Sequence, residues 1–341
     1  MRLRLTVIAV ALAALVVPLP ATIVDQFYGG VVFPRLQPVV TGASNLTAVA
    51  WFDLLLAVVL VPFVVLAVRD LRRRPLVAAL GRVALRGATI GAAAYLAFLL
   101  AWGLNYRREP LRRSAGYRAE RVTPAALEQL ARDAVRQVND LHGPAQAAGW
   151  SDARAIDPAL VRAFRDTLAR LGRPSHVRPG RPKRSVLDLY FRRAGVAGMT
   201  DPFFLETLIA SDTLPFERAQ TVAHEWAHLA GFTDEGEANF VGWLASVNGS
   251  TSTRYSGWLF MYAEAIGGLP SSVARAVAAE LGEGPRADLR AMRERHDREV
   301  SPHIAAAGWQ VYDGYLKANR LDAGTASYAE VVQLVLGTEY R

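Results

Sequence analysis

The residues whose types and spacing most restrict the chemistry of this chain are His224-Glu225-Trp226-Ala227-His228, an HExxH motif. On an α-helix, residues i and i+4 lie on one face, so both imidazoles can point at one metal ion about 2.0 to 2.1 Å away. Glu225 lies on the flank of that face, where it can take a proton from a zinc-activated water without binding the ion itself. The motif therefore predicts a zinc site of the hydrolytic kind.

The sequence around the motif predicts the helix that the two histidines need. Pro215 suits the first turn of a helix, and Gly231 suits a left-handed cap at its end. An apolar stripe at helical spacing runs through Ala219, Val222, Trp226 and Leu229. We expect the histidines to face away from this stripe.

The third metal ligand should come from one of three carboxylates that follow the helix. Asp234 completes HExxHxxGxxD, the spacing of a metzincin-like site. Glu235 begins Glu-x-x-Ala-Asn, which looks like the corresponding element of gluzincin peptidases, and Asn239 would then share its face and bond a histidine ring. Glu237 could be the reciprocal partner of an Asp234 N-cap on a helix over about 235–247, or the ligand itself. We favour Glu235, with Glu237 and Asp234 as alternatives.

Three apolar stretches in the first third of the chain have the length of bilayer-spanning helices. They cover about 5–24, 48–68 and 88–104, close to the roughly 17 to 25 residues that a span requires. The first could instead be a cleaved signal peptide, although no clear cleavage site follows it. Asp53, near the start of the second stretch, is expected to lie at the membrane interface. The sequence predicts a membrane domain over residues 1–104 and contact with a lipid bilayer.

The arginines around these stretches predict the orientation of the protein in a cell membrane. The first connection contains only Arg35, whereas the second is crowded by Arg69, Arg72, Arg73, Arg74, Arg82 and Arg86. The positive-inside rule places the second connection in the cytoplasm. Four further arginines after the third stretch argue the other way but form a sparser group. We expect a multi-pass membrane protein with its C-terminal domain outside the cytoplasm.

Composition excludes several other classes. The formal net charge of +8 gathers beside the apolar stretches and no nucleic-acid-binding motif is present, so we expect no nucleic-acid partner. The chain has no cysteine, which leaves His, Asp and Glu as zinc ligands. A transporter would need polar residues in several spans, and these stretches offer only Asp53.

The remaining residues, 105–341, should form a mainly α-helical domain with a small β element. Helices are predicted over about 124–141 and 158–171, and a buried helix over 255–270. Residues 202–210 are β-prone and are expected to form an edge strand that pairs with extended substrate, with Phe204 and Glu206 as substrate-contacting candidates.

Several side chains compete for the remaining catalytic role, the donor that stabilises an oxyanion. Tyr255 is the first candidate, and the alternatives are His296 and His303. Near the C-terminus, aromatic residues recur among apolar ones and are expected to pack terminal helices onto the core; they are Tyr312, Tyr315 and Tyr328.

Motifs spread over nearly the whole chain resemble those of a bacterial membrane family called domain of unknown function 3810. They are Trp102-Gly103-Leu104-Asn105-Tyr106-Arg107, Gly198-Met199-Thr200-Asp201-Pro202-Phe203, the HExxH motif with residues 235–240, Arg254-Tyr255-Ser256-Gly257 and Tyr312-Asp313-Gly314-Tyr315-Leu316-Lys317. The resemblance implies a membrane-anchored zinc metallopeptidase. The family's typical Pro-Phe-Thr-Gly-Glu segment reads Pro202-Phe203-Phe204-Leu205-Glu206 here.

Together these features predict three transmembrane helices followed by a zincin-like metallopeptidase domain. Zinc held by His224, His228 and Glu235, with Glu225 as general base, would hydrolyse a peptide or protein substrate in the cell envelope. The alternative is a non-catalytic membrane scaffold or sensor with a structural or vacant zinc site. Glu225 argues against it, because a structural site needs no carboxylate between its histidines.

Overall fold

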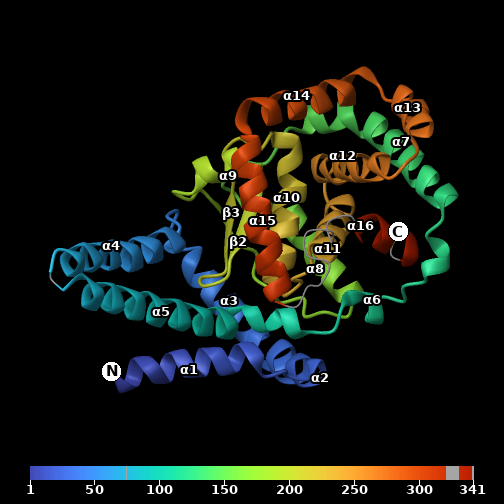
Figure 1. Ribbon diagram of the computed structural model, residues 1–341. Helices are drawn as coiled ribbons and strands as arrows, with labels where there is room; N and C mark the ends of the chain where they lie inside the picture. Colours follow the sequence, from blue (N-terminus) through green and yellow to red (C-terminus); the bar gives the residue numbers. More distant parts are fainter. Residues whose placement is uncertain (74, 320–329, 340–341) are drawn as a thin grey trace.

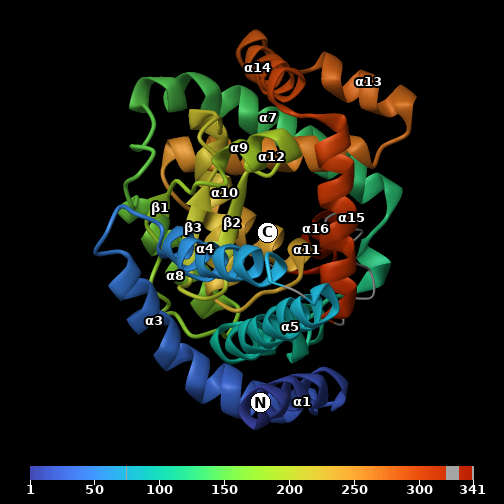
Figure 2. The same ribbon diagram turned by 60° about the vertical axis from the view of Figure 1, so that its left-hand side comes forward.

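The computed structural model describes residues 1–73, 75–319 and 330–339, and it is mainly helical (Figure 1). Arg74 and Tyr328 lie outside the described residues. The helices of the first third project to one side of a larger bundle, which contains one small sheet (Figures 1 and 2).

Within the described residues, two helices are long and apolar enough to cross a membrane, or three if a bent pair counts as one span. The two are α4 (Trp51–Leu71) and α5 (Leu76–Ala101), which lie side by side. The bent pair joins α1 (Arg2–Val16) to the segment Ala21–Ser44, which comprises α2 (Ala21–Ile23), the π-helix η1 (Val24–Val32) and α3 (Phe33–Ser44).

The prediction of one continuous first span over 5–24 is wrong in its boundaries. α1 ends at Val16, and the chain bends by 112° between the two parts of the pair. Val17 is extended, as expected for a residue before Pro18, and Pro20 follows two residues later. The two prolines therefore end the helix eight residues before the predicted boundary.

The helix of the third predicted span begins earlier than the predicted residue 88. It starts at Leu76, and its first turns include Arg82 and Arg86. Asp70 near the end of α4 accepts from Arg82 at 3.2 Å and from Arg86 at 2.9 Å, and both arginines lie in α5. These ion pairs fasten the turn between the two helices. The end of α5 at Ala101 is close to the predicted boundary of 104.

The rest of the chain is a helical bundle built around α10. Short elements come first: η2 (Gly103–Arg107), α6 (Leu111–Ser114) and η3 (Ala119–Arg121). The bundle itself consists of α7 (Pro124–Ala148), α8 (Pro158–Arg170), α9 (Asp188–Ala194), α10 (Pro215–Leu229), α11 (Glu235–Val247), α12 (Thr251–Gly267), α13 (Ser271–Ala279), α14 (Glu283–Glu299), α15 (Pro302–Ala318) and α16 (Glu330–Gly337). α10 packs against α11 and α12, and α12 packs along α7.

The helices predicted from capping signals are present. α10 and α11 have the predicted bounds, and Gly231 adopts φ +90° after α10. Thr123 and Asp157 cap α7 and α8 with their side chains, although α7 continues to Ala148. α12 covers most of the predicted buried segment.

The sheet corrects the predicted substrate strand at 202–210. That segment holds a turn around Leu205, which has φ +52°, and only its end belongs to β3 (Glu206–Ile209). β3 is the central strand, pairing in parallel with β1 (Pro182–Lys183) and antiparallel with β2 (Gly198–Asp201). The edge strands of the described sheet are therefore β1 and β2, and β2 has Thr200 opposite Thr207 and Met199 opposite Leu208.

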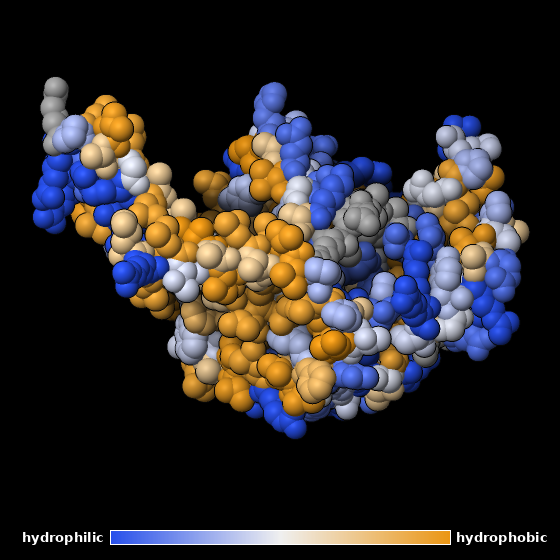
Figure 3. Space-filling model, turned by 60° about the horizontal axis from the view of Figure 1, so that its bottom comes forward, coloured by the Kyte–Doolittle hydropathy of each residue, from blue (hydrophilic) through white to orange (hydrophobic). Residues whose placement is uncertain are grey.

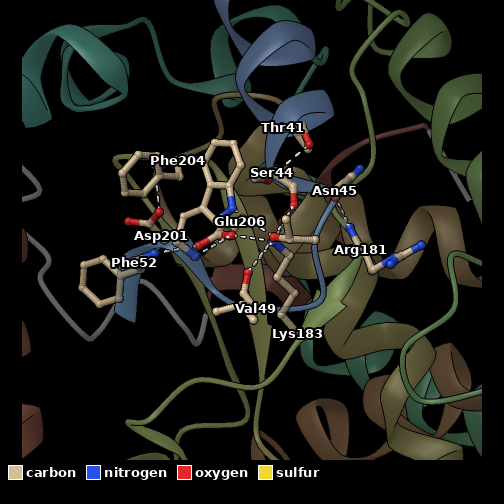
Figure 4. Close-up of polar contacts among 12 residues, drawn as sticks. Thr41, Ser44, Asn45, Val49, Phe52, Arg181, Lys183, Asp201, Phe204 and Glu206 are labelled. Carbon is tan, nitrogen blue, oxygen red and sulfur yellow. Dashed lines mark hydrogen bonds and ion pairs between the residues drawn. The ribbon is translucent and has the colours of Figure 1, made fainter. Parts of the chain in front are cut away.

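Glu206 has a structural role instead of a substrate-contacting one (Figure 4). It is 1% exposed and pairs with Lys183 at 2.6 Å, while Lys183 also donates to the carbonyls of Ser44 and Val49. The carboxylate accepts the backbone N–H groups of Trp51 and Phe52 at the N-terminus of α4. Glu206 thus caps a membrane helix, where a negative charge is favourable.

Phe204 likewise lies in the turn and not in a strand. Its backbone N–H donates to Asp201 (Figure 4). Its ring packs edge-on against Trp51 at a centroid distance of 5.7 Å. Asp53, two residues after Trp51 in α4, accepts the hydroxyl of Ser185 and the N–H of Val186. These contacts attach the beginning of α4 to the bundle.

The predicted membrane and C-terminal domains share one hydrophobic core. Phe98, Leu99 and Trp102 belong to the same buried cluster as Trp226 of α10 and Phe240 of α11. Trp102 donates its indole N–H to the carbonyl of His228 at 2.8 Å. The end of α5 therefore supports the motif helix directly.

Candidate metal centre

The motif residues lie on the buried α10 with their side chains divided between two faces. Trp226 is fully buried on one side and donates to the carbonyl of Gly180 at 2.9 Å. His224 and His228 point the other way, with their Nε2 atoms 3.1 Å apart. The predicted separation of the histidines from the apolar stripe is confirmed.

Glu235, at the first turn of α11, faces both histidines. Its Oε2 atom lies 3.3 Å from Nε2 of His224 and 3.5 Å from Nε2 of His228. α11 can approach α10 closely because Gly242 faces the backbone of His224, where a Cβ would lie 2.7 Å from the His224 nitrogen.

These three separations fit a single tetrahedral metal ion. Three atoms that each lie about 2.0 to 2.1 Å from one ion at tetrahedral angles are about 3.3 to 3.4 Å apart. The observed values of 3.1, 3.3 and 3.5 Å bracket that separation. Glu235 Oε2 is buried and has no hydrogen-bond donor among the described residues. His224, His228 and Glu235 could therefore hold a metal ion.

The alternative ligands Asp234 and Glu237 belong to a neighbouring site. Asp234 accepts the N–H of Glu237 as the predicted N-cap of α11. Glu237, however, does not return the bond, because its carboxylate accepts the N–H of Leu111. Both carboxylates line a separate pocket of about 330 Å³ that also holds Arg108 and Arg173. Burial raises the pKa of Asp234 to about 6, and burial together with Asp234 raises the pKa of Glu237 to about 8.

The second ring nitrogens of the histidines have different surroundings. Nδ1 of His228 lies 2.7 Å from the carbonyl of Phe232, which can only accept, so this nitrogen is the donor and Nε2 carries the lone pair. Nδ1 of His224 is buried with no hydrogen-bond partner among the described residues. Asn239 is buried on α11, but within the described part of the chain its side chain bonds neither ring. The predicted bond from Asn239 to a ring is therefore absent there.

Glu225 is held beside the candidate ligands by edge strand β2. It is 3% exposed, and the hydroxyl of Thr200 lies 2.9 Å from both its Oε2 and its backbone carbonyl oxygen. Gly198 gives the carboxylate room, because a Cβ there would lie 2.7 Å from Oε1. Burial raises the pKa of Glu225, although His224 and His228 oppose the shift. A carboxylate of raised pKa beside a ligand set is suited to proton transfer.

The candidate oxyanion donors are elsewhere in the fold. Tyr255 is fully buried in α12 and donates to Asp288 of α14 at 2.6 Å. His296 in α14 and His303 in α15 do not line the pocket that contains the metal-binding cluster. Tyr255 packs the bundle together, and the prediction that it contacts the site is wrong.

The structure brings Tyr312 and Tyr315 to the cluster instead. Both lie on α15, three residues apart, with stacked rings 5.9 Å apart. The hydroxyl of Tyr312 donates to Oε1 of Glu235, the oxygen that faces away from the histidines. The hydroxyl oxygens of Tyr106 and Tyr315 lie 3.4 Å apart, and burial raises the pKa of Tyr315 to about 12. In the sequence, the i, i+3 spacing of Tyr312 and Tyr315 could have indicated that both hydroxyls lie on one helix face. Their apolar neighbours made packing against the core the simpler interpretation.

A largely apolar pocket of about 740 Å³ surrounds the cluster. His224, Glu225, His228 and Glu235 form its polar end. The other walls are β2, α9, α15 and the ends of α1, α4 and α5 that meet the bundle. The cluster is thus accessible to a ligand of moderate size.

A known protein family matches most of the chain. The family model described as protein of unknown function (DUF3810) matches residues 28–336. The chain belongs to this family. The DUF3810 match includes edge strand β2, α10, α11 and the tyrosines of α15, so every residue of the cluster is part of the family region. No curated protein and no solved structure matched the chain.

Proposed function

We propose that this DUF3810 member is a membrane-anchored zinc metallopeptidase that uses Glu225 as general base. The observation that carries the proposal is the mutual spacing of Nε2 of His224, Nε2 of His228 and Oε2 of Glu235. Two imidazoles and one carboxylate are a ligand set of zinc hydrolases, and they leave a fourth position open.

Zinc, when bound, supplies Lewis acidity and lowers the pKa of a water toward neutrality. The residues of the chain then divide the remaining work. Glu225 accepts the water proton and delivers it to the leaving amine, and Thr200 holds its carboxylate in place. Tyr312 fixes the orientation of Glu235 through the oxygen that does not face the histidines.

Tyr315 replaces Tyr255 as the candidate donor to an oxyanion. It lines the same pocket as Glu225, and its raised pKa keeps the hydroxyl protonated at neutral pH. A hydroxyl positioned beside the ligand set could donate to the carbonyl oxygen as negative charge develops on it.

Edge strand β2 supports a peptide as the substrate. Gly198, Met199 and Thr200 line the pocket, and within the described residues β2 pairs with β3 on one side only. Extended peptides bind such edges through main-chain hydrogen bonds, which would place a peptide bond beside Glu225. The arginines at the connection between α4 and α5 favour a cytoplasmic location for that end, so the bundle would act on proteins or peptides of the cell envelope.

The competing function is a non-catalytic scaffold with a structural metal. The position of Glu225 argues against it, because this carboxylate lines the pocket beside the ligands and has no ligand role. A structural site gains nothing from a buried carboxylate held next to the metal ligands.

The test uses the full chain in phosphatidylcholine vesicles with a library of internally quenched fluorogenic peptides. The proposal expects zinc-dependent cleavage and a loss of about 10²- to 10⁴-fold in kcat for Glu225→Gln. Zinc binding by Glu225→Gln should match that of the unaltered chain. Equal cleavage by the two proteins, or zinc binding without cleavage of any peptide, whether soluble or membrane-anchored, would overturn the assignment.

A further inference from the structure

The pocket around the metal-binding cluster extends to the membrane helices. Leu15 of α1, Phe52 of α4 and Ala94 of α5 line it together with His224 and Glu225. All three belong to the helices of the first third, at the ends that meet the bundle. A ligand in this pocket therefore contacts the metal-binding residues at one end and the membrane helices at the other.

The composition of the pocket is unusual for a site that binds only soluble peptides. Apart from the cluster, Thr200, Asn319 and a few tyrosine hydroxyls, its walls are mostly aliphatic and aromatic, including Tyr95 and Phe98 of α5 and Trp309 of α15. Pockets of this kind bind apolar groups and orient them with a few polar contacts. At about 740 Å³, the volume suits an apolar group larger than one side chain.

Exposed apolar side chains outside the spans lie beside this pocket. On α9, Leu189 is 58% exposed and Tyr190 is 46% exposed, and on α15 Trp309 is 42% and Val311 74% exposed. α9 and α15 contact each other, and Tyr190 and Trp309 also line the pocket. In Figure 1, α9 lies on the same side of the bundle as α4. Amphipathic aromatic residues are enriched where protein meets the membrane interface.

The surface view agrees with an arrangement at the membrane. Hydrophobic residues cover the left and middle of Figure 3, where the helices of the first third come forward, and hydrophilic residues predominate on the right. α4 and α5 have 18-residue windows that are 0% and 11% buried inside the protein, so lipid must cover most of their apolar surface. The pocket is thus bounded partly by helices that lipid surrounds.

We propose that the substrate is a membrane-anchored polypeptide whose apolar anchor occupies this pocket while its peptide bond reaches the metal-binding cluster. The inference rests on the proposed peptidase function and specifies its substrate class. An anchor held between α5 and α15 brings the adjoining peptide segment alongside β2. Cleavage therefore occurs next to the anchor, and soluble peptides of the same sequence are poor substrates.

The anchor that fits a pocket of about 740 Å³ is the acyl chain of a lipid-modified peptide, because an apolar helix about 30 Å long and about 10 Å wide is too large to enter it. The test uses one fluorogenic peptide in three forms: without an anchor, with an N-terminal palmitoyl chain, and joined to an apolar helix of about 20 residues. Anchoring also concentrates substrate in the membrane, which alone can raise rates by about a hundredfold. Pocket occupancy must therefore be measured separately.

A matched pair of variants on α5 makes that separation. Ala94 and Ala97 are both exposed within the helix, but only Ala94 lines the pocket. Ala94→Trp fills the pocket and should lower cleavage of the anchored form by about tenfold or more, while Ala97→Trp should leave it unchanged. Leu15→Trp tests the same wall from α1 if Ala94→Trp does not fold. The ratio of anchored to unanchored cleavage should fall in Ala94→Trp and Leu15→Trp, and it should stay unchanged in Ala97→Trp.

Direct occupancy is measured with Glu225→Gln and the palmitoyl peptide carrying a photoreactive diazirine in its acyl chain. Crosslinks to the pocket walls of α5 and α15, reduced in Ala94→Trp and not in Ala97→Trp, support the proposal. Crosslinks elsewhere, or equal labelling of both variants, overturn it even if soluble peptides are cleaved. If the palmitoyl peptide crosslinks to the pocket but the unaltered chain cleaves no form of the peptide, the peptidase assignment is overturned. The pocket would then remain a binding site for the anchor.

Discussion

Tyr312 is the one described side chain that donates a hydrogen bond to the carboxylate of Glu235. Such a contact outside the ligand set fixes the ligand and typically contributes about 10- to 100-fold to metal affinity. We expect Tyr312→Phe to weaken zinc binding within this range, measured by competition with a chelating dye. Tyr190→Phe is the matched control, because Tyr190 lines the same pocket from α9. Equal affinity of the two variants would show that Tyr312 does not support Glu235.

Thr200 positions Glu225, since its hydroxyl lies 2.9 Å from the carboxylate. Thr200→Val keeps the side-chain shape but removes the donor, so the carboxylate should lose its fixed orientation and a stabilising contact to its charged form. We expect kcat to fall by about tenfold with little change in KM, and the acidic limb of the pH profile to move to higher pH. Thr200→Ser should restore both. An unchanged profile in Thr200→Val would exclude this positioning role.

At this scale, the sequence predicts residues related by local spacing better than those related by tertiary packing. His224, Glu225 and His228 follow from one helical turn, so their relation needed no further structure. The choice of Glu235 over Asp234 and Glu237 depends on where α11 packs and on the bond from Leu111 to Glu237. Tyr312 is 77 residues from Glu235, and no local pattern connects the two.

Among the elements, the contact of the sheet with α4 makes a prediction about stability. Lys183 and Glu206 form a buried ion pair whose side chains are 1% and 0% exposed. Removing one partner of such a pair leaves a charge without compensation and typically costs about 3 to 5 kcal/mol. We expect Lys183→Met to lower the free energy of unfolding by about this amount, measured by denaturation in detergent.

The control is the double variant with Glu206→Leu, which removes the second charge as well. It should recover part of the loss, but not all, because the N–H groups of Trp51 and Phe52 then lack their acceptor. If Lys183→Met unfolds together with the unaltered chain, the pair does not stabilise the attachment of α4.

The helices were predictable where the sequence contains caps and breakers, and the sheet was not. Asp234 and Gly231 mark the boundary between α10 and α11 by local chemistry. Pro18 and Pro20 also carried a breaker signal, but hydropathy alone extended the first span through them. The central position of β3 depends on its pairing with β1, two residues that show no strand pattern by themselves.

For the whole molecule, the shared core predicts that the C-terminal part does not fold alone. A fragment over 105–341 loses Phe98, Leu99 and Trp102, which are between 6% and 7% exposed and pack into the common core. It also loses the bond from Trp102 to His228. Large aromatic side chains each bury about 150 to 250 Å², so their removal exposes a substantial apolar surface.

We therefore expect the fragment to aggregate or to lack a cooperative unfolding transition, checked by size-exclusion chromatography and circular dichroism beside the full chain in detergent. A monomeric fragment with cooperative unfolding and full zinc binding would show that the membrane helices are dispensable for the site. The pocket wall that the membrane helices and the bundle form together could not be predicted from the sequence, because it arises only when α5, α10 and α15 pack together.

The measurement that tests the central claim most directly is metal content by inductively coupled plasma mass spectrometry on the purified full chain and its variants. The account predicts about one zinc per chain, lost in His228→Ala and Glu235→Ala but retained in Asp234→Ala, Glu237→Ala and Glu225→Gln. A folded chain without zinc would contradict it. Zinc that persists in Glu235→Ala and disappears in Glu237→Ala would contradict the ligand set.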